Sequence, residues 1–293
     1  MLVATPALRL FLVLLIAASA HLGSSITERE KSKTIDINYS LPSKPLSLHE
    51  PVILTLEVHN RGRESITLQL GQDRKAGFVL SLTLPDGTQV KLPNVTHGGV
   101  SDIGDVVVPA AGTFKHRLLL NQWYDFKKPG KYQLAARIMK PFLVGDASVP
   151  GEDRGFTGSF EIGPRIGANL TAACERLASE IKNLDSAGEW VQAATELSSI
   201  GDPVAVPYLQ QAMEQQPMVA YILAPGLAKI GNDAAVEALL AELSSPNATV
   251  AEPARGALRG IQDKISNPNL KETVKHNLSK DVTEQKQPRM SEF

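Results

Sequence analysis

The apolar positions of this chain follow two different periods, and the change falls near Gly163. In the first half, apolar and polar residues alternate within short runs, and residues 52–59 are the clearest case. A period of two is typical of β-strands with one buried face. In the second half, apolar residues recur every three or four positions, as on one face of a helix. The first such stripe consists of Leu170, Ala173, Leu177, Ile181 and Leu184. The pattern predicts a multidomain β + α protein, with strands over 34–163 and helices over 169–265.

The β-rich half contains about eight or nine predicted strands, with turns between them and no intervening helix. Pro85-Asp86-Gly87 predicts a hairpin, because glycine accepts the positive φ that tight turns require. Pro129-Gly130 turns the chain into a strand over 131–139. Short strands joined by such turns favour an antiparallel β-sandwich.

The helical half repeats itself. Residues 197–202 (LSSIGD) return as 227–232 (LAKIGN) and, more faintly, as LRGI at 258–261. A period of about thirty residues is a signature of stacked helix pairs, each of which buries its apolar face against the next. Asp202 and Asn232 stand where helix caps are expected, and Pro203 fits a first helical position.

Both halves resemble known families. Residues 54–60 (LTLEVHN), 84–88 (LPDGT) and 123–132 resemble bacterial Ig-like domains of the proteinase-inhibitor type. That resemblance implies an antiparallel Ig-like β-sandwich, although the aromatic motif of the middle strand is reduced here to Gly77-Phe78-Val79. The helical half, through 197–202, 227–232 and ARGAL at 254–258, is similar to short HEAT-like repeats of the phycobilisome-lyase type. This second resemblance implies a short α-helical solenoid that acts as a binding scaffold.

The two ends are expected to lie outside both domains. Arg9, an apolar run over 10–18 and the small residues up to Ala20 describe a signal peptide over 1–20, cleaved near Ala20. We therefore expect an exported protein, periplasmic or extracellular, without stable membrane insertion after cleavage. Residues 21–33 are predicted to be a flexible leader, and the polar residues 266–293 a disordered tail.

Charge and cysteine content exclude some classes of function. The chain has 30 basic and 31 acidic residues, a formal net charge of -1, and no basic run. A nucleic-acid partner is therefore not expected, since such a partner needs a basic face. Cys174 is the single cysteine, so no internal disulfide can form; it lies in a helical pattern and is predicted to be a buried apolar residue.

Candidate chemistry gathers in one loop, 96–105. None of the six histidines is spaced from another His or Cys as zinc ligands are, and no cofactor is predicted. His97, Asp102 and Asp105 could hold a cation, although a long loop also needs Gly and Asp simply to turn. Ser101 with His97 and Asp105 has the residue types of a hydrolase triad, but nothing on the loop orients them, so no catalytic residue is predicted.

Two sets of residues are candidates for contacting a protein partner. Trp123 and Tyr124 could form an exposed aromatic patch, or could close the end of the sandwich. Polar residues on the helical half could line the groove that stacked helix pairs form, which is the usual partner site of a solenoid. These residues are Glu189, Gln192, Glu196, Gln210 and Glu214.

The sequence thus favours an exported, non-enzymatic protein-binding scaffold that uses the helical groove, with the sandwich as a spacer or second contact surface. Two alternatives stay open. One is a protease inhibitor acting through the loop 97–105, and the other is an enzyme or enzyme subunit with a site at the domain junction.

Overall fold

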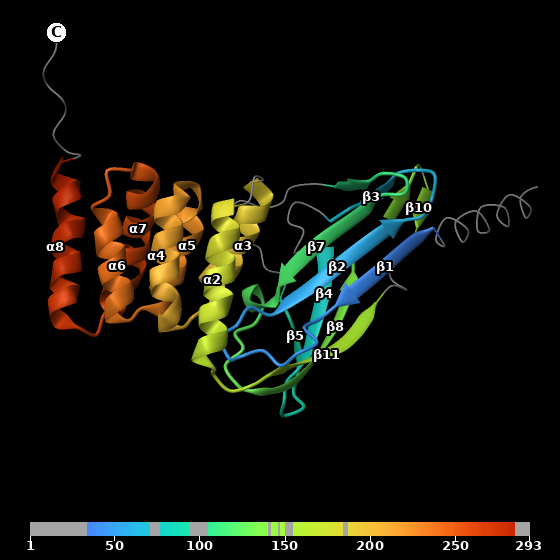
Figure 1. The fold of residues 1–293 in the computed structure, drawn as a ribbon, viewed down its shortest axis with the longest axis horizontal. Coiled ribbons are helices and arrows are strands. Elements are labelled where there is room, and N and C mark those ends of the chain that lie inside the picture. The colour runs from blue at the N-terminus through green and yellow to red at the C-terminus, as the bar shows by residue number, and fades with distance from the viewer. Residues whose placement is uncertain are drawn as a thin grey trace, which may run out of the picture. The chain divides into compact units, whose positions relative to one another are not determined.

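The computed structural model describes residues 34–70, 77–93, 105–139, 142–145, 147–149, 155–183 and 187–284. In this part of the chain the N-terminal half forms antiparallel sheets and the C-terminal half forms α-helices (Figure 1). The predicted mixed β plus α composition is therefore confirmed. The signal peptide, the leader and the cleavage point near Ala20 lie outside the described residues.

The chain divides into two compact units that are interleaved in sequence. The first unit consists of Ile53–Leu118, Gly130–Phe160 and, within the described residues, 34–43. The second unit consists of the helical half from Glu161 on, together with Lys44–Val52 and Leu119–Pro129. Two segments that precede Gly163 by many residues thus belong to the same compact unit as the helices.

The strands form three sheets, which are best given in their spatial order. The first is β1 (Ile35–Ser40), β2 (Ile53–Asn60) and β7 (Thr113–Leu119). The second is β10 (Ala147–Val149), β9 (Phe142–Val144), β3 (Ile66–Leu68) and β6 (Val106–Val108). The third is β11 (Phe156–Ile162), β8 (Gly130–Ile138), β4 (Phe78–Thr83) and β5 (Gln89–Lys91).

The predicted alternation positions the core of the β-rich half. The alternate residues of the 52–59 run are fully buried, and their neighbours stay half-exposed. The same holds for β8, where the buried side chains are those of Tyr132, Leu134, Ala136 and Ile138. The hairpin of β9 and β10 was not predicted, because strands of three residues are too short to display a period.

Seven α-helices occur in the described part of the helical half: α2 (Gly167–Asn183), α3 (Ala187–Ser199), α4 (Val206–Gln215), α5 (Ala220–Ile230), α6 (Asp233–Leu243), α7 (Ala248–Ile261) and α8 (Pro268–Glu284). They stack in sequence order (Figure 1). Within the stack α3, α5 and α7 pack successively on one another, and so do α2, α4, α6 and α8. We call these the α3 row and the α2 row.

The repeated leucines occupy equivalent places in the core. Leu197, Leu227 and Leu258 are each fully buried. Gly231 ends α5 in the left-handed conformation (φ 62°), a conformation that suits glycine. The two predicted caps are confirmed: Asp202 accepts the N–H of Val204 (3.1 Å), and Asn232 accepts that of Ala235 (3.0 Å).

Cys174 is buried, as predicted. Burial raises the pKa of its thiol to about 12, so the thiol is protonated at neutral pH. No helix in the described ranges is long and apolar enough to cross a bilayer.

The prediction of a disordered tail from residue 266 is wrong for most of that segment. Residues 268–284 form α8, and its Val274 and Leu278 belong to the helical core. The sequence suggested at most one helical turn, near 270–278, because the stripe is narrow, with one apolar residue every fourth position from Leu270, and the other positions are mostly polar. Polar positions of this kind suit a helix at the end of a stack, and α8 is the last helix among the described residues.

Candidate functional surface

The loop with the candidate cation ligands is largely outside the described residues. His97 and Asp102 lie in the undescribed stretch, and Asp105 is exposed. Among the residues that are described, no three His, Cys, Asp or Glu side chains are grouped as a metal site would require. The cation at 97–105 stays a prediction.

Trp123 belongs to the core rather than to an exposed patch. Its side chain is 8% exposed and that of Phe126 is 4% exposed. Tyr124 is half-buried and meets Phe126 edge to face, with the ring centroids 5.1 Å apart. The interpretation as a buried plug is therefore correct for Trp123. Tyr124 keeps some exposed surface with which it could contact a partner.

Glu196 is also misplaced by the sequence analysis, which assigned it to a polar surface. It is fully buried on α3, where its Oε1 accepts a hydrogen bond from Gln192 Nε2 one helical turn earlier (2.9 Å). Glu189, in the first turn of α3, is exposed. A carboxylate there interacts favourably with the N-terminal end of the helix dipole.

Gln210 and Glu214 lie on α4, in the other row, so the structure does not unite the five predicted residues on one row of helices. They meet Glu242 of α6, which is nearly buried. Burial raises the pKa of Glu242, the charge of Glu214 raises it further, and the hydrogen bond with Gln210 lowers it. This cluster is a polar contact between two helices, with Glu214 at its exposed rim.

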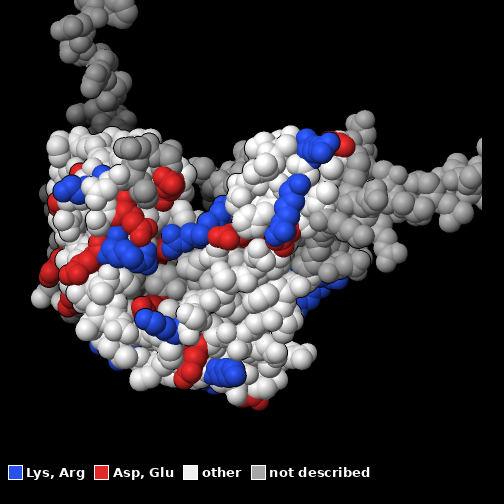
Figure 2. Space-filling model, turned by 45° about the vertical axis from the view of Figure 1, so that its right-hand side comes forward, with Lys and Arg blue, Asp and Glu red and all other residues white. Residues whose placement is uncertain are grey.

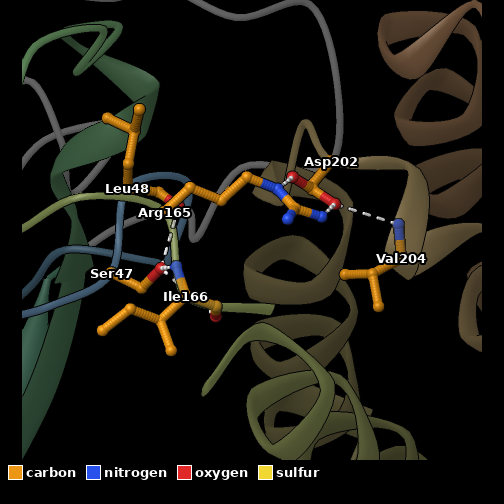
Figure 3. A network of polar contacts seen from close by, with 6 residues as sticks. All are labelled: Ser47, Leu48, Arg165, Ile166, Asp202 and Val204. Atoms are coloured by element: carbon orange, nitrogen blue, oxygen red, sulfur yellow. Dashed lines mark hydrogen bonds and ion pairs between the residues drawn. The ribbon is translucent and has the colours of Figure 1, made fainter. Parts of the chain in front are cut away.

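A polar network holds the chain as it enters the helices (Figure 3). The guanidinium of Arg165 binds both carboxylate oxygens of Asp202, Nε to Oδ2 at 2.6 Å and Nη2 to Oδ1 at 2.9 Å. The next residue, Ile166, donates its N–H to Ser47 Oγ at 2.7 Å. Ser47 and Asp202 are both buried. The hydrogen bond from Arg165 holds the pKa of Asp202 below its ordinary value, and Asp202 in turn raises the pKa of Arg165. The charges of Arg165 and Asp202 are paired with each other, so we assign the network a structural role.

Two large apolar side chains of the helical half face solvent within one turn of each other. Met218 is 58% exposed, in the short 3-10 helix Pro217–Val219, and Tyr221 is 42% exposed, in the first turn of α5. The sequence analysis missed both because, on the helical half, it considered only polar groups and did not work out the buried stripe of α5. A signal was present: Met218 and Tyr221 fall off the stripe formed by Val219, Leu223 and Leu227, all of which are buried.

Charged residues are interspersed by sign. On the face drawn in Figure 2, Lys and Arg side chains lie among Asp and Glu side chains and do not gather in one region. This agrees with the balanced composition of the chain.

No family model and no curated protein matches the chain. Solved structures that resemble part of it include a β-glucosidase from Listeria innocua, 14% identical, with 45% of this chain and 16% of that chain covered and a TM-score of 0.24. The structural-genomics target SoR45 is 12% identical over 44% of this chain and 82% of that chain, with a TM-score of 0.24. A PapD-like domain of human CEP192 is 13% identical over 45% and 84%, with a TM-score of 0.23. TM-scores so far below 0.5 support no inference about fold or function, and the chain spans only a small part of the glucosidase.

Proposed function

We propose that the chain is an exported, non-enzymatic protein-binding scaffold, in which an Ig-like β-sandwich precedes a short HEAT-like solenoid. The partner is a protein with an apolar surface that packs on the α3 row at α5, where side chains of this chain act as anchors. The observation that carries this proposal is the exposure of Met218 and Tyr221 within one turn of each other. Tyrosine is enriched at protein interfaces because it combines a large apolar ring with a hydrogen-bonding hydroxyl.

The exposed apolar surface continues along α5. Pro225 lies four residues after Tyr221, on the same face of the helix, and is exposed. One turn further, Lys229 extends its Nζ to the carbonyl of Ser199 at the end of α3 (3.0 Å). Met218, Tyr221 and Pro225 thus form an apolar strip, which we call the α5 strip, closed at one end by a charged group.

The helix that packs against α5 in the α3 row, α3, also carries polar groups that are not buried. Glu189 is exposed and Gln192 is half-buried. An apolar centre with a polar rim is the usual anatomy of a protein interface, and its binding energy is concentrated in a few aromatic side chains. In this proposal Glu189 and Gln192 belong to the polar rim of the interface.

The other two interpretations have less support. The protease-inhibitor alternative depends on the loop 97–105, most of which is outside the described residues. No described feature favours an enzyme, and both alternatives stay predictions.

The test is photo-crosslinking in the exporting cell with the full chain as bait and a photoreactive residue in place of Pro225. The purified partner is then titrated with the full chain, with Tyr221→Ala combined with Met218→Ala, and with Glu237→Ala as control. Glu237 is exposed on α6, in the α2 row.

We expect the double variant to weaken binding by about tenfold or more, because truncating an aromatic anchor at an interface costs upwards of 1 kcal/mol, and Glu237→Ala to change nothing. Binding that is equally strong in the double variant would show that the α5 strip is not the interface. Binding that persists when the helices are removed would assign recognition to the β-rich half instead.

A further inference from the structure

The exposed face of the β1–β2–β7 sheet carries a hollow that no part of the sequence analysis singled out. Its volume is about 400 Å³, at the small end of the range for ligand sites. Asp36 and Asn38 of β1, His59 and Arg61 at the end of β2, and Thr113 at the start of β7 line it. These polar side chains share the hollow because β1 and β2 pair antiparallel, with Asp36 opposite His59 and Asn38 opposite Glu57.

The walls of the hollow are fixed by a buried side chain. Asn60 is 2% exposed, and its Nδ2 donates to the carbonyl oxygens of Glu64 (2.8 Å), Val108 (3.1 Å) and Pro109 (2.9 Å). Its Oδ1 accepts the N–H of Gly62 (2.9 Å). One amide thus holds both turns that flank the hollow, so the hollow exists before a ligand arrives.

Backbone strain is stored at its edge. Ala111, which lines the hollow, has a φ of 57°, a left-handed conformation that residues with a Cβ rarely adopt. Strained backbone of this kind is found preferentially at ligand-binding positions, where the surrounding structure enforces it.

The charges of the hollow are balanced. Arg61 Nη2 lies 2.6 Å from Asp36 Oδ2, and Lys115 Nζ lies 2.8 Å from Glu57 Oε1 beside them. His59 holds Thr113 Oγ1 with its Nδ1, at 3.0 Å. The positive charge of Arg61 is therefore already neutralised by Asp36, and the negative charge of Asp36 by Arg61, so neither an anion nor a cation finds an unpaired opposite charge in this pair.

Hydrogen-bonding capacity nevertheless remains on both sides. Within the described part of the chain, the amide of Asn38 has no protein partner, Asp36 keeps one free carboxylate oxygen, and Arg61 uses one of its five N–H donors. Donors and acceptors are thus mixed over a short distance, and the side chain of Arg61 is 71% exposed.

We propose that this hollow binds a neutral, polyhydroxylated ligand, namely a single sugar unit. A hydroxyl both donates and accepts, so neighbouring hydroxyls can pair with a carboxylate, an amide and a guanidinium in turn. A simple anion or cation would use only the donors or only the acceptors of such a set, whereas a sugar uses both. The proposal concerns the β-rich half and is independent of the α5 strip.

The site binds and does not cleave. The site has the residue types of a hydroxyl–imidazole–carboxylate triad, in Thr113, His59 and Glu57. However, His59 Nε2 and Glu57 Oε2 are 3.8 Å apart, which is too long for a hydrogen bond. Both side chains are also about one-third exposed, at 35% and 34%, so water is not excluded from them.

The experiment is saturation-transfer and chemical-shift NMR on the full chain, with the methyl glycosides of glucose, galactose, mannose and N-acetylglucosamine as probes and with acetate and inorganic phosphate as anionic probes. The variants are Arg61→Ala, Arg61→Lys and Asn38→Ala. Arg63→Ala is the matched control, because Arg63 is exposed two residues from Arg61 but does not line the hollow.

We expect at least one glycoside to shift the amide signals of Asn38, His59 and Arg61. We expect its affinity to fall about tenfold in Arg61→Ala and Asn38→Ala, since each removes hydrogen bonds to the ligand, and to be unchanged in Arg63→Ala. Arg61→Lys keeps the ion pair with Asp36 but loses the planar fork, so it should also weaken binding while the fold is retained. Binding of acetate or phosphate in place of all glycosides, or glycoside shifts that persist in the three hollow variants, overturns the proposal.

Discussion

At the residue scale, Asp202 makes two interactions that a mutation can separate. It caps the turn at Val204 and binds the guanidinium of Arg165. Asp202→Asn keeps the cap, because asparagine caps helices as well as aspartate, and loses the ion pair. We expect Asp202→Asn to lower the free energy of unfolding by about 1 kcal/mol at pH 7. The value is modest because half of the Arg165 side chain is exposed to water.

The pH dependence of this loss follows from the lowered pKa of Asp202, whose main cause is the hydrogen bond from Arg165. A carboxyl with a lowered pKa in the folded state stabilises the fold above its ordinary pKa, and that stability disappears as the pH falls through the lowered value. Urea unfolding at pH 7 and near pH 3 measures this dependence. The difference in free energy of unfolding between wild type and Asp202→Asn should be smaller at the lower pH.

Asp125→Asn is the control for that measurement. Asp125 pairs with Lys127, but 64% and 77% of these two side chains are exposed. An exposed pair of this kind contributes little, so the control should be nearly silent at both pH values. A gap for Asp202→Asn that is constant with pH would show that the ion pair does not stabilise the fold.

Individual residues also show which features could be predicted from the sequence and which could not. The caps at Asp202 and Asn232 and the burial of Cys174 could be predicted, because each follows from its immediate neighbours. The pairing of Arg165 with Asp202, 37 residues apart, has no local signal. Glu196 was placed on the surface because carboxylates are rarely buried, and the sequence analysis did not recognise that Gln192, one turn earlier, could donate a hydrogen bond to it.

At the scale of elements, α8 gives the clearest test, because it was expected to be disordered. Val274 is fully buried, whereas its neighbour Thr273 is exposed. We expect Val274→Asp to destabilise the helical half by about 3 kcal/mol or more, because it buries an unpaired charge, and Thr273→Asp to have little effect. Thermal unfolding followed by circular dichroism at 222 nm compares the two. Equal melting curves would mean that α8 does not dock on the core.

Elements were predictable where they were long enough to show a period. The stripes of α2 and the alternation of β2 and β8 span several repeats of their pattern, and each was placed correctly. The strands β9 and β10 are three residues each, and α8 shows a single apolar residue every fourth position, so neither pattern stands out from the surrounding sequence. The α5 strip was missed for a different reason: it is visible only once the buried stripe of α5 is known.

At the scale of the whole molecule, the change of period near Gly163 locates the end of the strands but not the limits of the compact units. Lys44–Val52 and Leu119–Pro129 join the helical unit through pairings that leave no mark on the local pattern. Leu46 donates its N–H to the carbonyl of Glu161 (2.9 Å) and accepts that of Gly163 (2.7 Å). The Ser47 hydroxyl then accepts the N–H of Ile166.

These pairings make a prediction about a fragment that begins at Glu161. Such a fragment keeps the described α-helices α2 to α8 but loses the Leu46 and Ser47 contacts that hold the entry to α2. The first turn of α2 depends on that entry, because Asn169 and Leu170 both donate to the carbonyl of Ile166 (3.1 and 3.2 Å). Amide hydrogen exchange in this turn should therefore accelerate about tenfold or more relative to the full chain, while exchange in α6 and α7 stays unchanged.

In the full chain, Ser47→Ala removes only the side-chain bond and should produce a smaller acceleration at the same amides. If the fragment protects the first turn of α2 as well as the full chain does, the helices are complete without Lys44–Val52, and the boundary near Gly163 is also the boundary of the folded unit.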